Sequence, residues 1–351
     1  MVFVCYGTRP EVIKIASVVK ALQQEHIPFR LVFTGQHQNL YEDVKHLLPP
    51  PDYDLQVMRP NQTVNYVLSA IIRELDELLR KEKPQLIMVQ GDTTTVLASA
   101  LAAFNNRIAV GHIEAGLRTY NLESPFPEEA NRQLVSRIAR FNWAPTEWSA
   151  ENLRREGLQN IEVTGNTVVD TCRSFDFPIS YGNKVLITLH RRENFGEKMR
   201  TIFQQIEDLA QAHPELTFVF PMHPNPEVQR HKSIFKAVQV LRPLGYDDMM
   251  KMLSEVRFVI SDSGGLQEEC AAFGKKILVC RDTSERPEGM DAGFAKLVGT
   301  DVQSWFDWAN DDPVWKGDNP YGDGAAGRRI AQSVSRFLKE MESKGIAPLA
   351  S

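Results

Sequence analysis

The chain has 351 residues, which is more than one hydrophobic core usually organises, so we expect two domains. Hydrophobic residues make up 42% of the chain and charged residues 24%, a composition that excludes general disorder. The formal net charge of -5 excludes a general binder of nucleic acid or of anionic membranes, so an anionic ligand needs a local cluster of cationic side chains and backbone N–H groups.

The cysteine pattern and the first residues predict a cytoplasmic protein. The four cysteines are scattered without the CxxC spacing of zinc and redox sites, and this suits a reducing compartment. The first residues lack the basic and apolar regions of a signal peptide, and no stretch approaches the roughly 20 apolar residues of a membrane span. We therefore expect no membrane association. We also expect no resident metal and no cofactor.

Two series of alternating strands and helices predict two largely parallel sheets. The first series has strands at Val2–Tyr6, Phe29–Phe33, 86–89 and 108–112, with helices near 12–22, 64–83 and 93–106. The second series has strands at 184–189, 216–220, Phe258–Ser261 and Ile277–Val279, with helices near 199–212 and after Gly265. An amphipathic helix near 325–344 closes the chain.

These series define the expected domains. We predict an amino-terminal domain at 1–172, a linker at 173–183 and a carboxyl-terminal domain at 184–325. The last helix, within 326–351, is expected to pack back towards the amino-terminal domain. The predicted fold is α/β, with two Rossmann-like doubly wound domains that face a central cleft. Ligand-binding motifs should then lie just after the strands.

The turn after the first strand is a candidate anion site. Gly7 permits a tight turn and Pro10 fits the first turn of a helix. Arg9 and Lys14 then lie near the positive end of that helix. The turn has neither Walker nor GxGxxG spacing, so neither ATP nor NAD is implied. The alternative is an ordinary strand-to-helix turn with solvated basic residues.

A second phosphate motif follows the strand Phe258–Ser261. Ser263, Gly264 and Gly265 lead directly into a helix, where backbone N–H groups and the Ser263 hydroxyl can approach a diphosphate. Glu269, about one and a half turns later, could accept hydrogen bonds from both ribose hydroxyls. The alternative is an N-capped helix with a glutamate on its solvated face.

Three acids occupy equivalent positions after strands or at a helix start. Asp92 follows one strand, Glu114 follows the next, and Glu128 comes after two prolines that predict a rigid start to a helix. Asp92 could also cap a helix, and Glu128 and Arg132 have the i,i+4 spacing of a pair on one helical face. Around one cleft, the three acids suit general acid–base chemistry on a sugar.

The second series adds imidazole and guanidinium groups. His190 and Arg191 end its first strand, and His223 follows the next strand in a proline-stiffened loop. The two histidines lack short metal-ligand spacing, so a metal site is the weaker interpretation. Arg286 belongs to a further charged loop after Ile277–Val279.

Taken together, these motifs resemble those of the non-hydrolysing UDP-N-acetylglucosamine 2-epimerases over nearly the whole chain. The resemblance rests on Gly7–Glu11, Gly91–Thr95, His112–Thr119, Pro127–Arg132, His190–Asn194, Asp262–Glu269, Arg281–Glu288 and Asn319–Gly324. It implies a GT-B-like pair of domains, a cytoplasmic homodimer, and reversible conversion of UDP-GlcNAc to UDP-ManNAc for bacterial surface polysaccharides.

The resemblance also implies roles for individual residues. The catalytic set would be Asp92, Glu114, Glu128 and His190. The residues that hold the UDP-sugar would be Arg9, Lys14, Arg132, Ser263, Gly264, Gly265, Glu269 and Arg286. A second, activating UDP-GlcNAc would contact Gln36, Arg191 and His223. Departures from the family pattern affect the uracil contacts, at Leu244 and Met249, and the activating site, at Asn39 and Asn61.

Elementary chemistry agrees with an elimination. The C2–H beside an acetamido group is a very weak acid, so loss of UDP from C1 should come first or nearly so and acidify that proton. A carboxylate then forms 2-acetamidoglucal, and protonation of the other face with return of UDP gives the epimer. The alternatives are a hydrolysing epimerase that releases ManNAc and UDP, a GT-B glycosyltransferase, and a non-catalytic sugar-nucleotide sensor.

Overall fold

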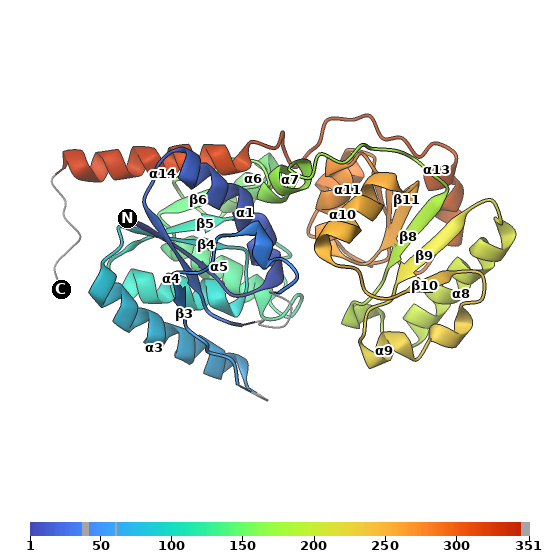
Figure 1. Ribbon diagram of the computed structural model, residues 1–351, viewed down its shortest axis with the longest axis horizontal. Helices are drawn as coiled ribbons and strands as arrows, with labels where there is room; N and C mark the ends of the chain where they lie inside the picture. Colours follow the sequence, from blue (N-terminus) through green and yellow to red (C-terminus); the bar gives the residue numbers. More distant parts are fainter. Residues whose placement is uncertain (37–41, 60–61, 345–351) are drawn as a thin grey trace. The chain divides into compact units, whose positions relative to one another are not determined.

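The computed structural model describes residues 1–36, 42–59 and 62–344, and the chain divides into two compact units (Figure 1). Unit 1 comprises Met1–Thr171 and Gly322–Ser351, and unit 2 comprises Cys172–Tyr321. Asn39, Asn61 and the end of the chain from residue 345 lie outside the described residues. Within the described ranges, none of the helices combines the length and hydropathy that a membrane span needs.

Unit 1 is built on a seven-stranded sheet, as far as its residues are described, with all neighbouring strands parallel. Its strands are β1 (Val2–Tyr6), β2 (Phe29–Phe33), β3 (Tyr53–Asp54), β4 (Leu86–Gln90), β5 (Ala109–Ile113), β6 (Phe141–Ala144) and β7 (Ile161–Val163). The order is β3-β2-β1-β4-β5-β6-β7, and Val4 of β1 pairs with Leu31 and Met88 on its two sides. The order reverses between β1 and β4, which defines the switch point of a doubly wound sheet.

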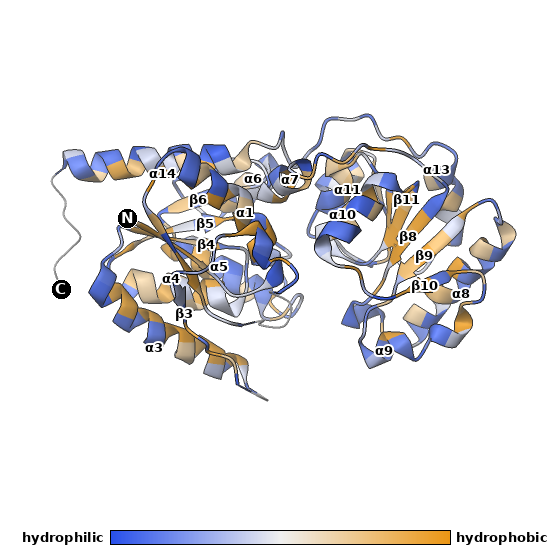
Figure 2. Cartoon of the chain, viewed as in Figure 1, coloured by the Kyte–Doolittle hydropathy of each residue, from blue (hydrophilic) through white to orange (hydrophobic). Residues whose placement is uncertain are grey.

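Helices cover both faces of this sheet, so its central strands are apolar on both sides (Figure 2). They are α1 (Arg9–Gln24), α3 (Val64–Glu82), α4 (Thr94–Asn105), α5 (Glu128–Ile138), α6 (Glu147–Arg155), α7 (Thr167–Arg173) and α14 (Ala326–Ser343), with a 3-10 turn η1 (Lys45–Leu47). Beneath them, side chains such as Phe3 and Val89 are fully buried.

The last helix, α14, belongs to unit 1 although it follows unit 2 in the sequence. The Asp170 carboxylate accepts the backbone N–H groups of Ala326 and Gly327, at 3.2 and 2.9 Å, and so caps the start of α14. A Cβ atom at Gly327 would lie 2.6 Å from the carbonyl oxygen of Ser17 on α1. Only glycine therefore permits this close approach of α14 to α1.

Unit 2 repeats the same strand order in a six-stranded parallel sheet over its described residues. The strands are β8 (Lys184–Thr188), β9 (Thr217–Pro221), β10 (Gln239–Leu241), β11 (Phe258–Ser261), β12 (Ile277–Val279) and β13 (Ala295–Leu297). The order is β10-β9-β8-β11-β12-β13, with the switch point between β8 and β11. Ile260 of β11 pairs with Ile187 and Leu278.

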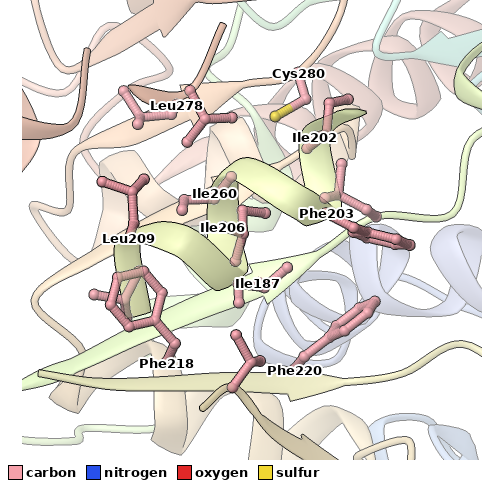
Figure 3. Close-up of a cluster of buried hydrophobic side chains, with 14 of the residues drawn as sticks. Ile187, Ile202, Phe203, Ile206, Leu209, Phe218, Phe220, Ile260, Leu278 and Cys280 are labelled. Atoms are coloured by element: carbon pink, nitrogen blue, oxygen red, sulfur yellow. The ribbon is translucent and has the colours of Figure 1, made fainter. Parts of the chain in front are cut away.

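The core of unit 2 lies between this sheet and its helices. The helices are α8 (Glu197–Ala212), α9 (Pro226–Gln229), α10 (Tyr246–Glu255), α11 (Gly264–Ala272), α12 (Glu288–Asp291) and α13 (Phe306–Asn310), with 3-10 turns η2 (Arg192–Asn194), η3 (Lys232–Ile234) and η4 (Gln303–Trp305). Ile187 and Ile260 of the sheet pack with Phe203 and Ile206 of α8 (Figure 3). These apolar side chains are fully buried.

The prediction of an α/β fold with two parallel sheets is confirmed. The sequence pattern missed β3, β6, β7, β10 and β13, which have two to four residues each. Four of these form the edges of the sheets, where half-exposed strands lack the continuous apolar run of a central parallel strand.

Candidate active site

The loop after β1 is held by a buried carboxylate. Glu11, 1% exposed, accepts the backbone N–H groups of Gly7 at 2.6 Å and Thr8 at 2.8 Å, and also the hydroxyl of Thr93 from the loop after β4. Burial raises the pKa of Glu11 to about 7, although the hydrogen bonds from Thr93, Gly7 and Thr8 act to lower it. Because Glu11 occupies two N–H groups at the start of α1, an anion at this turn would depend on cationic side chains.

The two cations predicted at this turn both contact carboxylates within unit 1. Arg9 Nη2 lies 2.9 Å from Asp43 Oδ2, and Lys14 Nζ donates to Glu114 Oε1. The side chains of Lys14 and Glu114 are only 10% and 7% exposed, and Gln90 Nε2 donates to the other carboxylate oxygen of Glu114. Glu114 follows β5 with a φ of 65°, a left-handed conformation that is uncommon for a residue other than glycine. A predicted cation and a predicted acid thus form one mostly buried ion pair.

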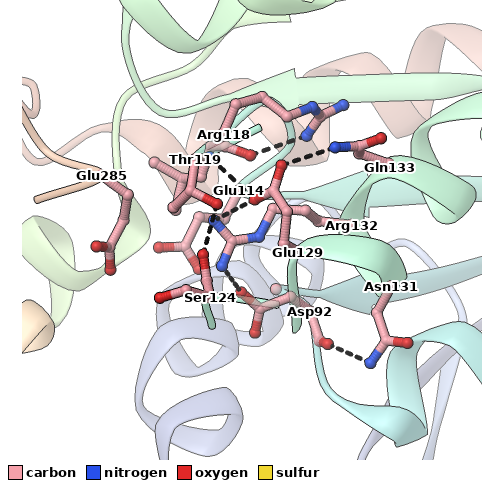
Figure 4. A network of polar contacts seen from close by, with 12 residues as sticks. Asp92, Glu114, Arg118, Thr119, Ser124, Glu129, Asn131, Arg132, Gln133 and Glu285 are labelled. Atoms are coloured by element: carbon pink, nitrogen blue, oxygen red, sulfur yellow. Dashed lines mark hydrogen bonds and ion pairs between the residues drawn. The ribbon is translucent and has the colours of Figure 1, made fainter. Parts of the chain in front are cut away.

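Asp92 lies two residues after the end of β4 and contacts two residues of α5. Its Oδ2 lies 2.7 Å from Arg132 Nη2, and its backbone oxygen accepts the side-chain amide of Asn131 at 2.8 Å (Figure 4). The N-cap of α4 is Thr93, whose side chain accepts the backbone N–H of Val96. The alternative that Asp92 caps this helix is therefore wrong, and its carboxylate is left to the ion pair with Arg132.

The two adjacent glutamates at the start of α5 lie in different environments. Glu129 is fully buried and accepts the backbone N–H groups of Thr119 at 3.0 Å and Tyr120 at 3.1 Å, with Arg132 Nη1 at 3.5 Å (Figure 4). Glu128 is the first residue of α5 and is half-buried. Glu129 therefore fixes the loop that precedes α5, whereas the half-buried Glu128 retains some exposure to solvent.

The second predicted phosphate motif forms the start of α11 in unit 2. Ser263 is the N-cap and its hydroxyl accepts the backbone N–H of Leu266 at 3.4 Å. Gly264 and Gly265 form the first turn, and a Cβ atom placed on Gly265 would meet no heavy atom of the described chain within 4 Å. Glu269 lies further along α11 and is half-buried. The start of α11 is therefore capped by Ser263 and has free space at the Cβ position of Gly265, and an anion near this turn would lie at the positive end of the helix.

Arg286, predicted to bind the diphosphate, lies against this turn in a buried ion network. Its Nε donates to Glu268 Oε1 at 2.7 Å, and it also pairs with Glu285, which Arg281 contacts at 2.9 Å. A Cβ atom at Gly264 would lie 2.7 Å from Arg286 Nη1. Burial opposes ionisation of Glu285, but Arg286 and Arg281 outweigh it and hold the pKa of Glu285 well below its usual range.

His190 follows β8 and is organised by a carboxylate at the end of β11. Asp262 is fully buried and accepts the backbone N–H groups of His190 at 3.1 Å and Arg191 at 2.9 Å. It also accepts the side-chain amide of Asn194 at 3.0 Å, which bonds in addition to the backbone oxygen of Cys280. His190 Nδ1 lies 3.8 Å from Asp262 Oδ1. Asp262 thus connects the two strands of the unit 2 switch point.

The residues predicted to bind a second, activating ligand fall in both units. Gln36 in unit 1 accepts the backbone N–H and the hydroxyl of Thr95, at 3.2 and 2.8 Å. In unit 2, Arg191 shares the His190 turn, and the ring of the exposed His223 stacks on that of His190 with centroids 5.1 Å apart. Burial lowers the pKa of both histidines. Arg191 lowers the pKa of His190 further, His190 lowers that of His223, and Asp262 opposes the shift in both.

Three buried carboxylates that organise these loops had no predicted role: Glu11, Glu129 and Asp262. The spacing of Thr8 and Glu11 is that of a capping box, so Glu11 could have been found from the sequence. Nothing local distinguishes Glu129 from Glu128, or marks Asp262 as buried. Over the described residues, no group of three or more His, Cys, Asp or Glu side chains is placed to hold a metal ion.

Known proteins with similar sequences and structures identify the family. Residues 20–335 match the profile of a family described as UDP-N-acetylglucosamine 2-epimerase. The UDP-N-acetylglucosamine 2-epimerase of Campylobacter jejuni is 38% identical over 366 residues, which cover 94% of this chain and 96% of that protein.

Two solved structures are similar over the same extent. The UDP-GlcNAc 2-epimerase of Neisseria meningitidis, bound to UDP-GlcNAc, has a TM-score of 0.87 at 38% identity and covers 95% of this chain and 99% of its own. The enzyme of Methanocaldococcus jannaschii, in complex with UDP-GlcNAc and UDP, has a TM-score of 0.81 at 30% identity with the same coverage. The chain therefore belongs to the UDP-N-acetylglucosamine 2-epimerase family, whose members are isomerases of a nucleotide-sugar.

Proposed function

We propose that the chain catalyses the reversible, non-hydrolysing C2 epimerisation of UDP-GlcNAc to UDP-ManNAc by elimination and re-addition of UDP. The observation that carries the proposal is the pair of acids on the adjacent strands β4 and β5 of unit 1. Glu114 stands directly after β5 and Asp92 two residues after the end of β4, and each is paired with a cation, Lys14 or Arg132. Carboxylates held in this way suit proton transfer at a sugar carbon.

The chemical steps balance without an oxidant, a cofactor or a consumed water. The C1–O bond breaks and its electron pair leaves with UDP, which gives oxocarbenium character to C1 and acidifies the C2–H bond. One carboxylate accepts the C2 proton, and the electron pair of the C–H bond becomes the C1–C2 double bond of 2-acetamidoglucal. A second acid then protonates C2 from the opposite face, and an oxygen of UDP re-forms the bond to C1. We assign these transfers to Asp92, Glu114 and Glu128.

In this proposal unit 2 binds the leaving group. The start of α11 directs its positive end and the open backbone at Gly265 towards a diphosphate, while Ser263 and Arg286 supply further donors. Glu269 would accept the ribose hydroxyls. Such donors stabilise the charge that grows on UDP as the C1–O bond breaks, and they retain UDP for its return. His190, held beside this turn by Asp262, would contact the same diphosphate.

The relatives support the choice of substrate. The Neisseria structure contains UDP-GlcNAc, and the Methanocaldococcus structure contains UDP-GlcNAc and UDP. We further propose that the UDP-ManNAc product supplies ManNAc-type sugars for surface polysaccharide synthesis.

The test is incubation of the purified chain with UDP-GlcNAc in deuterated water, followed by proton and phosphorus NMR. We expect UDP-ManNAc to appear, deuterium to enter C2 of both epimers, and little free UDP to accumulate. Free UDP and ManNAc formed at the rate of turnover would identify a hydrolysing enzyme instead. Epimerisation without deuterium at C2 would rule out the proposed elimination. If UDP-GlcNAc stays unchanged, the proposed epimerase activity is wrong, and the glycosyltransferase and sensor alternatives remain.

A further inference from the structure

A buried carboxylate that the proposed chemistry does not use lies directly behind the His190 turn. Asp262 is fully buried, and its own backbone N–H donates to the carbonyl oxygen of Thr188 at the end of β8. Its two carboxylate oxygens accept two successive backbone N–H groups and one side-chain amide, all from the turn at 190–194. A buried carboxylate with this many donors holds a loop in one conformation, because each N–H group would be unsatisfied elsewhere.

The charge of Asp262 also acts on the imidazole of His190. His190 Nδ1 lies 3.8 Å from Asp262 Oδ1, and the carboxylate raises the pKa of His190 against the larger, lowering effect of burial. The other groups that affect this ring are Arg191 on the same turn, which lowers the pKa, and His223 on the loop after β9, which stacks on it. Among the described residues, Asp262 is therefore the one negatively charged group that affects the pKa of His190.

We propose that Asp262 is a positioning residue for the epimerase reaction, which fixes the backbone of His190 beside the Ser263–Gly265 turn and places a negative charge next to its imidazole. The action of His190 on UDP rests on the proposed function. The effect of Asp262 on the backbone and the charge state of His190 involves unit 2 alone, and the NMR titration of His190 measures it without any activity. Asp262 itself does not touch the reacting atoms in this proposal.

Unit 2 offers a matched control in Glu207 of α8. Glu207 is 1% exposed, and its carboxylate accepts the backbone N–H groups of Lys236, Ala237 and Val238 at 2.9 to 3.2 Å. These residues come directly before β10. Glu207, like Asp262, is therefore a buried carboxylate that holds a loop next to a strand of the unit 2 sheet. Glu207→Gln therefore disturbs unit 2 in a comparable way without touching the switch point.

The experiment compares Asp262→Asn, Glu207→Gln and His190→Ala in the full chain. Asparagine places an NH2 group, itself a donor, where the carboxylate accepts N–H groups from the turn. The substitution also removes the negative charge. We expect the pKa of His190, read by NMR of histidine-labelled protein, to fall in Asp262→Asn and to stay unchanged in Glu207→Gln. We expect kcat for UDP-GlcNAc to fall by about 100-fold in Asp262→Asn, as for a misplaced group at a reacting centre.

A double-mutant cycle tests whether Asp262 acts through His190. In the His190→Ala background, Asp262→Asn should lower kcat by no more than about 3-fold, because the group that it positions is already missing. Additive losses, or an unshifted His190 titration in Asp262→Asn, would overturn the proposal. If His190→Ala keeps full kcat, the role of His190 in the proposed function is wrong, and the titration alone then decides the role of Asp262.

A second variant covers the case in which Asp262→Asn does not fold. Asp262→Glu keeps the charge but displaces the carboxylate by one methylene. We expect it to retain a His190 titration close to that of the unaltered chain and to lose kcat, because the turn is held in a shifted position. Unaltered kcat in Asp262→Glu would show that the exact placement of this carboxylate does not matter, and would overturn the proposal.

Discussion

The guanidinium of Arg132 lies 2.7 Å from Oδ2 of Asp92, and this ion pair joins the turn after β4 to the helix α5, 40 residues further along the chain. Arg132 is buried, whereas the Asp92 side chain is 28% exposed. The arginine therefore serves as a fixed cation behind an accessible carboxylate. A candidate proton acceptor is thus held in place without being shielded from a substrate.

Asp92→Asn should abolish most activity while leaving the fold intact. Asparagine can still accept from Arg132 but cannot take a proton, so we expect kcat to fall by about 100- to 10,000-fold. Asp76 of α3 provides the control, since it also pairs with an arginine, Arg80 at 2.9 Å, with a side chain 32% exposed. Asp76→Asn should keep its activity. Initial rates and thermal unfolding are measured for both variants. Equal activity in the two would contradict the proposed role of Asp92 in proton transfer.

The neighbouring acids Glu128 and Glu129 should respond in opposite ways to the same substitution. Glu129→Gln weakens a fully buried acceptor of two backbone N–H groups, so we expect a loss of about 1–3 kcal/mol in the free energy of unfolding. Glu128→Gln should cost less unfolding free energy than Glu129→Gln, because Glu128 is only half-buried, and it should lower kcat. Denaturant unfolding and steady-state kinetics on both variants separate the two effects. A Glu128→Gln variant that is unstable but active would reverse our assignment of the pair.

Glu11 should make the stability of the chain depend on pH. Burial raises its pKa from an ordinary value of 4.5 to about 7, so between these values the folded chain binds a proton that the unfolded chain has lost. Its contribution to stability is therefore fully present below pH 4.5 and is lost as the pH rises through 7. The loss amounts to about 3 kcal/mol.

The measurement is the free energy of unfolding of the unaltered chain and of Glu11→Gln between pH 4.5 and 8. Glutamine resembles the protonated acid and does not titrate, so the stability advantage of the unaltered chain over Glu11→Gln should shrink as the pH rises. Parallel curves for the two proteins would show that Glu11 titrates alike in the folded and unfolded states.

Gly265→Ala should raise stability and weaken UDP binding. A methyl group there meets no heavy atom of the described chain within 4 Å, and alanine in the first turn of α11 is favoured over glycine by up to about 1 kcal/mol. The same methyl group would occupy the space through which a diphosphate approaches the backbone. Thermal unfolding measures the expected rise in stability, and calorimetric titration with UDP measures the expected fall in affinity. Unchanged affinity for UDP would place the diphosphate elsewhere.

The sequence determined the two parallel sheets and the places where function gathers. The alternation of apolar strands with helical periodicity is a local property, and polar motifs at strand ends such as Gly91–Thr95 and Asp262–Glu269 are legible one segment at a time. The strands β1, β2, β11 and β12 were predicted with their observed bounds. Of these, β1, β11 and β12 are buried along their whole length, which makes them largely continuous apolar runs. The proposed catalytic roles, the homodimer and the activating site stay predictions.

Only the tertiary structure decided which charged groups meet. Lys14 and Glu114 are 100 residues apart, and Asp262 and the His190 turn are about 70 apart, so no local pattern reports their contacts. The direction of each side chain decided the rest, because it buried Glu129 beneath the loop and left its neighbour Glu128 half-buried. Residue type and spacing mark where charge gathers, whereas burial and long-range pairing decide which of those charges hold the fold and which remain accessible to a ligand.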